Sequence, residues 1–227
     1  MFSSGIYAIL DGDRLGLVTP ASVRDALPLL TELAVAAREA GAVALQLRLK
    51  SLEKPSVVRG EVAAVLLRAL AGQLPLIVND DAESAGRAGA GLHLGQGDGE
   101  VGQARMSLGE SALIGWSTHN LEQVRAGNDV PCNYIGFGPI LWTASKSALD
   151  PVTGWAHLTD ACAASQRPVV AIGGLGAAQA TLVRATGAHA MAVISGWLGA
   201  QSERPSAESA YVRLRELVAA WQAGGTP

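Results

Sequence analysis

The chain alternates short apolar segments with longer amphipathic ones, and this alternation limits its fold more than any other feature. The short segments are rich in Val, Ile, Leu and Ala, as buried strands are, and lie at 5–10, 43–47, 74–78, 91–94, 112–115, 134–137, 168–172 and 190–194. The longer segments are Ala-rich with Glu and Arg at helical spacing, and lie at 22–40, 56–72, 82–88, 101–108, 121–126, 155–164, 177–185 and 206–222. The sequence therefore predicts strands and helices in strict alternation.

This alternation is typical of a parallel sheet, because each parallel strand pair needs a crossover connection and strands buried on both faces are apolar throughout. Eight such units predict an α/β fold, a single (β/α)8 TIM barrel. The alternative is an open doubly wound sheet, which is less favoured because no GxGxxG follows the first strand. No linker or low-complexity segment divides the chain, so we expect one barrel domain at 1–222 and a flexible C-terminal tail at 223–227.

Charge and composition exclude several classes of function. The chain has 17 Lys and Arg against 20 Asp and Glu, a formal net charge of -3, and no basic cluster, which argues against binding to nucleic acid or to an anionic membrane. No apolar stretch approaches the roughly 18 residues of a membrane span, so we expect a cytoplasmic protein. Cys132 and Cys162 form no CxxC motif, and we expect two ordinary buried thiols.

Polar residues follow the second predicted strand, where a barrel carries its chemistry. Gln46, Arg48 and Lys50 alternate along the chain, so on a strand they would share one face and point into the barrel mouth. Two cations and an amide on one face suit a phosphate or pyrophosphate. The alternative is a strand end whose polar tips are merely solvated.

Acidic residues follow the next two strands. Asn79, Asp80 and Asp81 come directly after the third strand, and Asp98 follows the fourth. Carboxylates from two adjacent loops can hold Mg2+, which takes one or two carboxylates, water and substrate phosphate oxygens. The alternative is that Asp80 or Asp81 only caps the helix that follows.

Hydroxyl and ammonium groups follow the fifth and sixth strands. Ser117 and His119 come after the fifth strand, and the loop after the sixth carries Thr143, Ser145 and Lys146. This loop could wrap a polyphosphate through its hydroxyls and its ammonium group. His119 by itself is more often structural than catalytic.

Glycines and small residues follow the last two strands. Gly173 and Gly174 end the seventh strand, and Ile194 and Ser195 end the eighth. Backbone N–H groups exposed at these two strand ends form the recurrent phosphate cradle of barrel enzymes, and the alternative is that the glycines only turn a tight corner. Together with the sites above, they predict two anion-binding sites at one barrel mouth.

In this order and spacing, the motifs resemble those of the thiamine phosphate synthase family, which also includes the related thiazole tautomerases. The motifs that carry the resemblance are Gln46-x-Arg48-x-Lys50, Val78-Asn79-Asp80, Gly91-Leu-His93-Leu-Gly95-Gln96-x-Asp98, Gly115-x-Ser117-x-His119, Gly136-x-Gly138-Pro139-Ile-x-x-Thr143-x-Ser145-Lys146, Ala171-Ile-Gly173-Gly174 and Val193-Ile194-Ser195.

The resemblance implies a Mg2+-dependent transferase that joins 4-amino-2-methyl-5-hydroxymethylpyrimidine diphosphate to a thiazole phosphate or its carboxylate. The products would be thiamine phosphate and pyrophosphate, formed through a dissociated pyrimidinylmethyl cation. The residues implied for the pyrimidine diphosphate are Gln46, Arg48, Lys50, Asn79, Thr143, Ser145 and Lys146. Those implied for the other roles are Asp80 and Asp98 for Mg2+, Ser117 for the reacting centre, and Gly174, Ile194 and Ser195 for the thiazole phosphate. Arg48, Lys50, Ser117 and Lys146 would be catalytic.

Four departures from the family pattern bear on this expectation. Asp81 stands where the family usually has Arg, and Trp142 stands where it usually has Pro. Ser145 replaces the commoner Thr, and residues 147–150 lack the basic residues often seen after the Lys. A carboxylate near the diphosphate should weaken its binding, so we expect Asp81→Arg to tighten it.

Two alternative functions stay open. A thiazole tautomerase would use His119, and a catalytically silent barrel would only bind thiamine precursors. The diphosphate-type residues favour the synthase, with small-molecule substrates as partners and a homodimer as a possible assembly.

Overall fold

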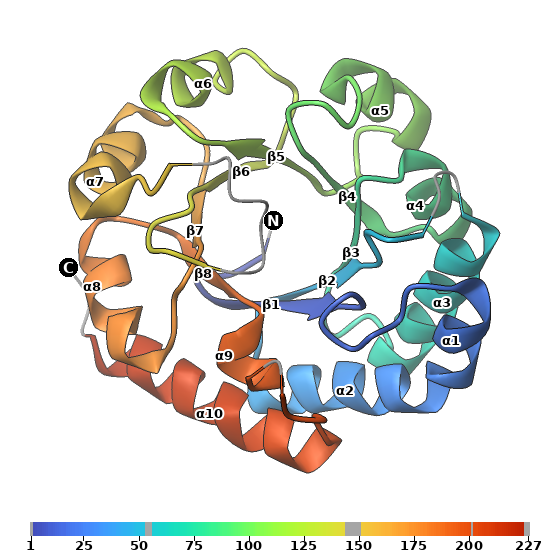
Figure 1. Cartoon of the computed structure of the whole chain (residues 1–227). Helices are drawn as coiled ribbons and strands as arrows, with labels where there is room; N and C mark the ends of the chain where they lie inside the picture. Colours follow the sequence, from blue (N-terminus) through green and yellow to red (C-terminus); the bar gives the residue numbers. More distant parts are fainter. Residues whose placement is uncertain (1, 53–55, 144–150, 201, 225–227) are drawn as a thin grey trace.

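The computed structural model describes residues 2–52, 56–143, 151–200 and 202–224. In it eight parallel strands form a closed barrel with helices packed around the outside (Figure 1). The strands are β1 (Gly5–Asp11), β2 (Ala44–Arg48), β3 (Leu76–Asn79), β4 (Gly91–Leu94), β5 (Ile114–Thr118), β6 (Tyr134–Phe137), β7 (Val169–Ile172) and β8 (Ala190–Val193). The helices are α1 (Pro20–Asp25), α2 (Leu27–Ala40), α3 (Val57–Leu70), α4 (Ala82–Ala88), α5 (Val101–Leu108), α6 (Leu121–Ala126), α7 (Gly154–Ala164), η1 (Ala177–Gln179), α8 (Ala180–Ala185), α9 (Ser195–Leu198) and α10 (Ala207–Ala223).

The predicted (β/α)8 barrel is confirmed, and the open doubly wound sheet is excluded because the first and last strands pair. In the parallel register of β1 with β8, Gly5 lies opposite Ala190 and Ala8 opposite Val193. Each of the other strands pairs with its sequence neighbours, so the sheet has no edge.

The helix predictions differ from the structure in two places. The predicted helix 22–40 is two helices, α1 and α2, separated at Ala26. Pro28 lies in the first turn of α2, where its missing N–H costs no hydrogen bond, and α1 is capped by Thr19 through the Ser22 amide. The four-residue α9 was not predicted, because a single turn is too short to show a helical period.

The core has two layers, because alternate strand residues point to opposite faces. Along β1, Ile6, Ala8 and Leu10 pack in the layer between the strands and the helices. Tyr7 and Ile9 point the other way, into a smaller cluster inside the barrel. Phe2 belongs to this inner cluster and lies edge-on to Tyr7 and Tyr134, with ring centroids 5.7 and 5.2 Å away, which closes the amino end of the barrel.

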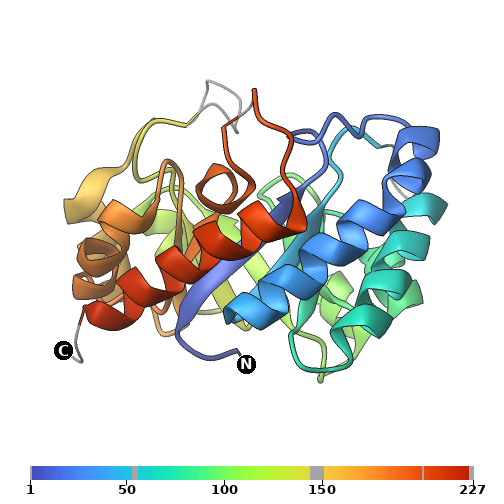
Figure 2. The same cartoon turned by 90° about the horizontal axis from the view of Figure 1, so that it is seen from below.

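The C-terminal helix completes the outer layer. α10 packs beside α2 and crosses the outside of β1, as Figure 2 shows. α10 continues to Ala223, one residue beyond the predicted domain end, and residues 225–227 of the predicted tail lie outside the described part of the chain. Among the described residues, no helix combines the length and the apolar character needed to cross a bilayer.

Candidate active site

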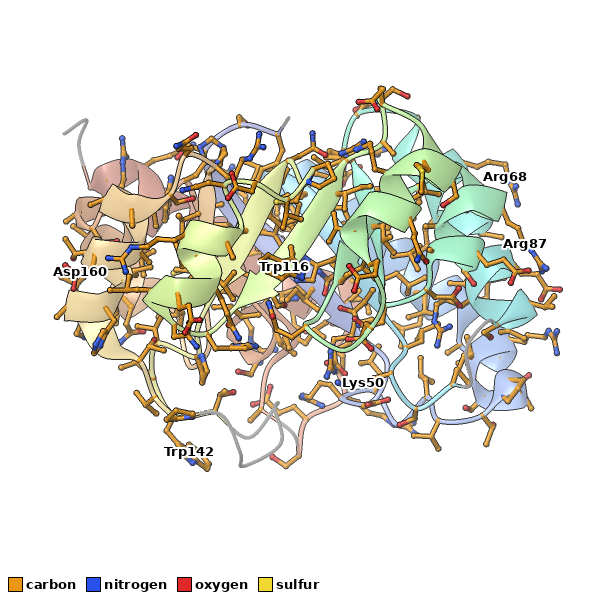
Figure 3. The ribbon with its side chains drawn as sticks, turned by 90° about the horizontal axis from the view of Figure 1, so that it is seen from above. Lys50, Arg68, Arg87, Trp116, Trp142 and Asp160 are labelled. Carbon is orange, nitrogen blue, oxygen red and sulfur yellow. The ribbon has the colours of Figure 1, made fainter. Side chains whose placement is uncertain are left out.

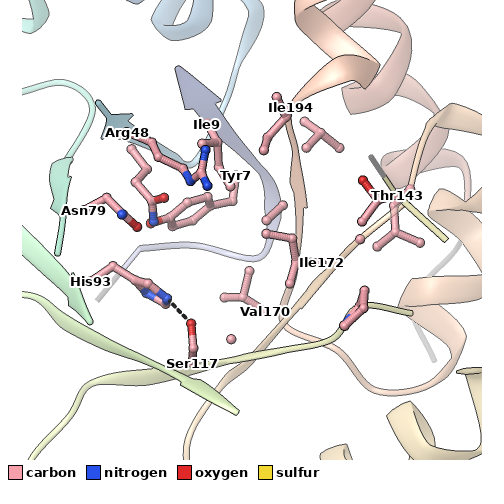
Figure 4. A pocket seen from close by; sticks show the side chains of 18 of the residues that line it. Tyr7, Ile9, Arg48, Asn79, His93, Ser117, Thr143, Val170, Ile172 and Ile194 are labelled. Atoms are coloured by element: carbon pink, nitrogen blue, oxygen red, sulfur yellow. Dashed lines mark hydrogen bonds between the residues drawn. The ribbon is translucent and has the colours of Figure 1, made fainter. Parts of the chain in front are cut away.

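A single cavity at the carboxyl ends of the strands brings together most of the residues predicted for the site. Eight of the predicted site residues line it: Gln46, Arg48, Asn79, Ser117, Thr143, Gly174, Ile194 and Ser195. Apolar side chains such as Ile9, Val170 and Ile172 form the wall between them (Figure 4). The sequence prediction therefore located the cavity, although it did not identify every residue in it.

The cation in the cavity, Arg48, is held by a carboxylate that the sequence analysis missed. Arg48 Nη1 donates to Asp11 Oδ2, and the Asp11 side chain is only 3% exposed at the end of β1. Asp11 also accepts from the backbone N–H of Arg14 at 3.0 Å, which fixes the carboxylate. Because a guanidinium has five N–H donors, Arg48 can be oriented by Asp11 and still bind an anion.

A chain of hydrogen bonds crosses the floor of the cavity. Gln46 Nε2 donates to the Tyr7 hydroxyl at 2.9 Å, and the Tyr7 and Tyr134 hydroxyls are 2.9 Å apart. His93 then links Tyr134 to Ser117, with Nδ1 at 3.0 Å from the Tyr134 hydroxyl and Nε2 at 2.9 Å from Ser117 Oγ. Five side chains from strands β1, β2, β4, β5 and β6 are thus connected, and Figure 4 shows the last link.

Both phenols in this chain are protonated at neutral pH. Burial raises the pKa of Tyr7, and the hydrogen bonds with Tyr134 and Gln46 offset only part of that rise. Burial, with a smaller contribution from Tyr7, raises the pKa of Tyr134 well above its ordinary value. Each hydroxyl therefore has a proton that it can donate to one of its two neighbours. The sequence analysis assigned no role to Tyr7, His93 or Tyr134.

The loop after β6 forms another wall of the cavity and rests on the end of β7. Ile140 N–H donates to Ile172 O at 2.9 Å, and Leu141 N–H donates to Gly173 O at 3.0 Å. Thr143 lies at the end of this described stretch and lines the cavity, whereas Trp142 is 79% exposed (Figure 3). Ser145 and Lys146, predicted for the same loop, lie outside the described residues.

The two glycines that follow β7 lie where the structure has no room for a side chain. Gly173 and Gly174 have φ of +104° and +68°, where side chains are disfavoured. A Cβ on Gly174 would lie 2.6 Å from Trp142 O, and one on Gly173 would lie 2.5 Å from Pro139 Cβ. The glycines thus turn a tight corner under the β6–α7 loop, and they also line the cavity beside Ile194 and Ser195. The two alternatives given for them in the sequence analysis are compatible.

Three predicted residues lie outside the set that lines the cavity: Lys50, Asp80 and Asp98. β2 ends at Arg48, so the alternation that placed Lys50 beside it does not extend to Lys50, which is exposed at the loop end of the barrel (Figure 3). Asp80 follows β3 with φ +61°, a conformation that Asp tolerates better than most residues, and its N–H donates to His93 O at 2.8 Å. The Asp98 carboxylate lies over Gly95, since a Cβ there would be 2.5 Å from Asp98 Oδ2.

Asp80 and Asp98 fit a Mg2+ site by the chemistry of their donor groups. They extend from the ends of neighbouring strands β3 and β4, and two carboxylates with substrate phosphate oxygens match the ligands that Mg2+ prefers. Within the described ranges, no three His, Cys, Asp or Glu side chains cluster in a way that would hold a metal ion without such help.

The expectation for Asp81 is wrong, because its side chain lies in the protein interior, away from the cavity. Asp81 Oδ2 is ion-paired with Arg59 Nη1, and the two side chains are 2% and 1% exposed. Arg59 also donates to the carbonyls of Leu49 and Leu52 at 2.8 and 2.9 Å, and Asp81 caps α4 by accepting from Ser84 N–H at 2.9 Å. Asp81 therefore ties the β2–α3 loop to the start of α4, which confirms the capping alternative.

Burial and hydrogen bonding act in opposite directions on the Asp81 carboxyl group. Burial favours the neutral acid, but the hydrogen bonds from Ser84, Arg59 and Ser56 outweigh it and lower the pKa. Asp81 is thus charged at neutral pH and balances the buried charge of Arg59.

His119, the residue that a tautomerase would use, lies outside the residues that line the cavity. Its Nδ1 is 2.7 Å from Gly138 O, and because a carbonyl only accepts, Nδ1 is the donor. Its backbone N–H donates to Gln123 Oε1 at 2.7 Å. These contacts hold His119 at the junction of β5 and α6.

Comparison with known proteins gives one consistent result. The family model described as thiamine monophosphate synthase matches residues 15–197. The chain is 36% identical over 190 residues to a thiamine-phosphate synthase of Albidiferax ferrireducens, covering 83% of this chain and 84% of the relative. It is 38% identical over 190 residues to that of Anaeromyxobacter dehalogenans, covering 82% and 83%.

A solved structure agrees with this result. The thiamine phosphate pyrophosphorylase of Pyrococcus furiosus superposes with a TM-score of 0.79 at 25% identity, over 98% of this chain and 97% of that one. Fold and sequence agree, and the chain belongs to the thiamine monophosphate synthase family.

Proposed function

We propose that this transferase joins a hydroxymethylpyrimidine diphosphate to a thiazole phosphate in its barrel mouth and releases pyrophosphate. Thiamine-phosphate synthase is the activity that family membership gives the chain, and the substrates and residue roles are what we add. The observation that carries the proposal is the single cavity with two unlike walls. Figure 4 shows Arg48, Asn79 and Ser117 on one side of the cavity and Ile194 on the other, and Gly174 and Ser195 also line the cavity.

The polar wall suits the pyrimidine diphosphate. Arg48 would bind a diphosphate oxygen through the N–H groups that Asp11 does not use, and Gln46 and Asn79 would hydrogen-bond the polar edge of the pyrimidine ring. Lys50, Ser145 and Lys146 would complete the anion site when the substrate is bound. The opposite wall, at Gly174, Ile194 and Ser195, would take the thiazole phosphate through N–H and hydroxyl donors.

Bond breaking would then depend on charge stabilisation by fixed groups. In a dissociative step, the C–O bond to the diphosphate breaks, both electrons leave with pyrophosphate, and a pyrimidinylmethyl cation remains. Arg48, Lys50 and Lys146 would stabilise the negative charge that grows on the leaving group, and Ser117 would donate a hydrogen bond near the reacting centre. The thiazole nitrogen then supplies the electron pair for the new C–N bond, so no general base is required.

Asp80 and Asp98 would hold Mg2+ beside the diphosphate. The ion would supply additional positive charge to the phosphate oxygens. The protein's own part would be to hold the two carboxylates in the loops that follow the adjacent strands β3 and β4.

The test is an assay for thiamine phosphate and pyrophosphate with both substrates, in Mg2+ and in EDTA. We expect both products in Mg2+ and neither in EDTA. Arg48→Ala should lower turnover at least a hundredfold, since oriented charged donors of this kind contribute about 2.7–4 kcal/mol. The matched control is Arg87→Ala on the outer face of α4, where the side chain is 52% exposed and points away from the barrel (Figure 3).

Two results would overturn the proposal. The first is the absence of product with folded protein in Mg2+. The second is isomerisation of the thiazole carboxylate phosphate without condensation, which would assign the chain to the tautomerases and make His119 the residue to study.

A further inference from the structure

We infer that the hydrogen-bond chain beneath the cavity has a fixed direction, which makes Gln46, Tyr7, Tyr134 and His93 positioning residues that aim the Ser117 proton into the cavity. The direction follows from the Gln46 amide at one end of the hydrogen-bond chain and from the protonation of the two phenols. It does not depend on the proposed function, whereas its use in holding an anionic substrate does.

The direction starts at Gln46, whose amide nitrogen can only donate. Gln46 Nε2 lies 2.9 Å from the Tyr7 hydroxyl, so the Tyr7 oxygen is the acceptor. Tyr7 must then donate its proton onward to Tyr134, 2.9 Å away. Gln46 is 4% exposed and Tyr7 and Tyr134 are each 1% exposed, so water does not compete for these groups.

In the second half of the hydrogen-bond chain, the same direction continues from Tyr134 through His93 to Ser117. Because Tyr134 accepts from Tyr7, its own proton is donated to His93 Nδ1 at 3.0 Å. Nδ1 is therefore an acceptor, which leaves the ring proton on Nε2, and Nε2–H donates to Ser117 Oγ at 2.9 Å. Among the described residues, no further protein group is within hydrogen-bonding distance of Ser117 Oγ, so its proton is available to a ligand in the cavity it lines.

The opposite direction would change what Ser117 can do. If Ser117 donated to His93 instead, the hydroxyl would present only lone pairs to the cavity and would repel a phosphate oxygen. The hydrogen-bond chain therefore favours an anion over a cation beside Ser117 Oγ. Tyr7, Tyr134 and His93 exert this effect through Ser117, without a hydrogen bond of their own to the anion.

The other histidines provide internal standards for a test of the direction. The chain has four histidines. His119 and His157 place Nδ1 at 2.7 Å from carbonyl oxygens, so their protons are on Nδ1, whereas His189 places Nε2 at 3.0 Å from Phe2 O, so its proton is on Nε2. His93 should therefore match His189 and differ from the other two.

The experiment is nitrogen NMR of the full chain labelled with 15N-histidine, with His93→Gln used to assign the His93 signals. We expect His93 to carry its proton on Nε2 in the unaltered protein. Gln46→Glu replaces the terminal donor with a carboxylate that only accepts, so at mildly alkaline pH every bond should reverse and the proton should move to Nδ1. Tyr7→Phe removes the link between Gln46 and Tyr134 and should give a mixture of the two His93 tautomers.

A proton on Nδ1 of His93 in the unaltered protein would overturn the inference, as would a tautomer that Gln46→Glu leaves unchanged. If Gln46→Glu does not fold, the first measurement decides alone. These spectra need no turnover, so they separate failure of the chain's direction from failure of the proposed function.

Kinetics test the consequence for Ser117. Tyr134→Phe should lower kcat roughly three- to tenfold, the value of one oriented hydrogen bond, with KM for both substrates changed less than about twofold. Combined with Ser117→Ala it should add nothing further, because Tyr134 acts through Ser117. Full additivity of the two losses would contradict that role.

Discussion

The buried pair of Arg59 and Asp81 allows a sharp prediction, because an isosteric change can remove its charge and keep its shape. Asp81→Asn should destabilise the barrel by about 3–5 kcal/mol, the cost of removing one charge from a buried ion pair. Helix capping is not the source of this loss, since Asn caps as well as Asp and can still accept from Ser84 N–H. The cost arises at Asp81 Oδ2, which accepts from Arg59 and from Ser56 N–H.

The assay is urea unfolding followed by far-UV circular dichroism. With a slope of about 3 kcal/mol per molar urea, the predicted loss lowers the midpoint by about 1–1.7 M. Glu83→Gln is the matched control, because it removes the same charge from an ion pair on α4 whose side chains are about half exposed. It should cost under about 0.5 kcal/mol.

A double-mutant cycle tests the cause of the loss. Once Arg59→Met has removed the guanidinium, Asp81→Asn no longer takes one charge from a buried ion pair, so the double variant should lose at least about 2 kcal/mol less stability than the sum of the two single losses. The reasoning fails if Asp81→Asn costs less than about 1 kcal/mol, or if the two losses simply add.

Three further predictions concern the acid stability of the protein and the proposed roles of Asp98 and Lys146. Folding lowers the pKa of Asp81, so its contribution to stability is complete above the carboxyl's ordinary pKa of about 3.9 and is lost as the pH falls through the lower folded value. The free energy of unfolding of the Asp81→Asn protein should therefore fall less steeply with decreasing pH than that of the unaltered protein. Asp98→Ala should nearly abolish Mg2+-dependent turnover, and activity within twofold of the unaltered chain would remove Asp98 from the metal site. Lys146→Ala should lower kcat while leaving thiazole phosphate affinity, measured by calorimetry, nearly unchanged; an equal loss in affinity would place Lys146 at the other substrate.

The position of Asp81 also reverses the expectation for Asp81→Arg. A second guanidinium would face Arg59 in a space where both side chains are nearly inaccessible to solvent. The substitution should therefore destabilise the protein and cannot tighten diphosphate binding. The expectation was wrong because the motif does not show that Asp81 is the N-cap of α4 and that its carboxylate contacts Arg59.

Strand positions were predictable because a strand that is buried on both faces appears in the sequence as a continuous apolar segment between polar loops. β4 and β6 match their predicted ranges of 91–94 and 134–137, and α4 matches 82–88, where Gly89 ends the helix with φ +71°. The break between α1 and α2 was missed, since amphipathic spacing continues across it. Periodicity detects buried faces and is insensitive to a single residue that changes the helix direction.

The site was only partly predictable, for a geometric reason. The alternation of side chains along β2 correctly predicted that Gln46 and Arg48 line the cavity. It failed for Lys50, because β2 ends at Arg48. Tyr7 and Tyr134 lie on strands far apart in sequence and look like ordinary core residues in a single chain. Their meeting depends on the barrel's register, which residue spacing does not reveal.

The β6–α7 loop explains how one cavity can hold two anions in a fixed relation. Its backbone donates to the carbonyls of Ile172 and Gly173, and it packs so closely on Gly173 and Gly174 that neither position has room for a side chain. Thr143, predicted for the diphosphate, therefore lies on a loop that rests on the predicted thiazole phosphate cradle. A shift at either site would move the other through backbone contacts. Because bond formation between two bound substrates depends on their mutual placement, this shared support would contribute to the proposed catalysis by holding the two anions in register.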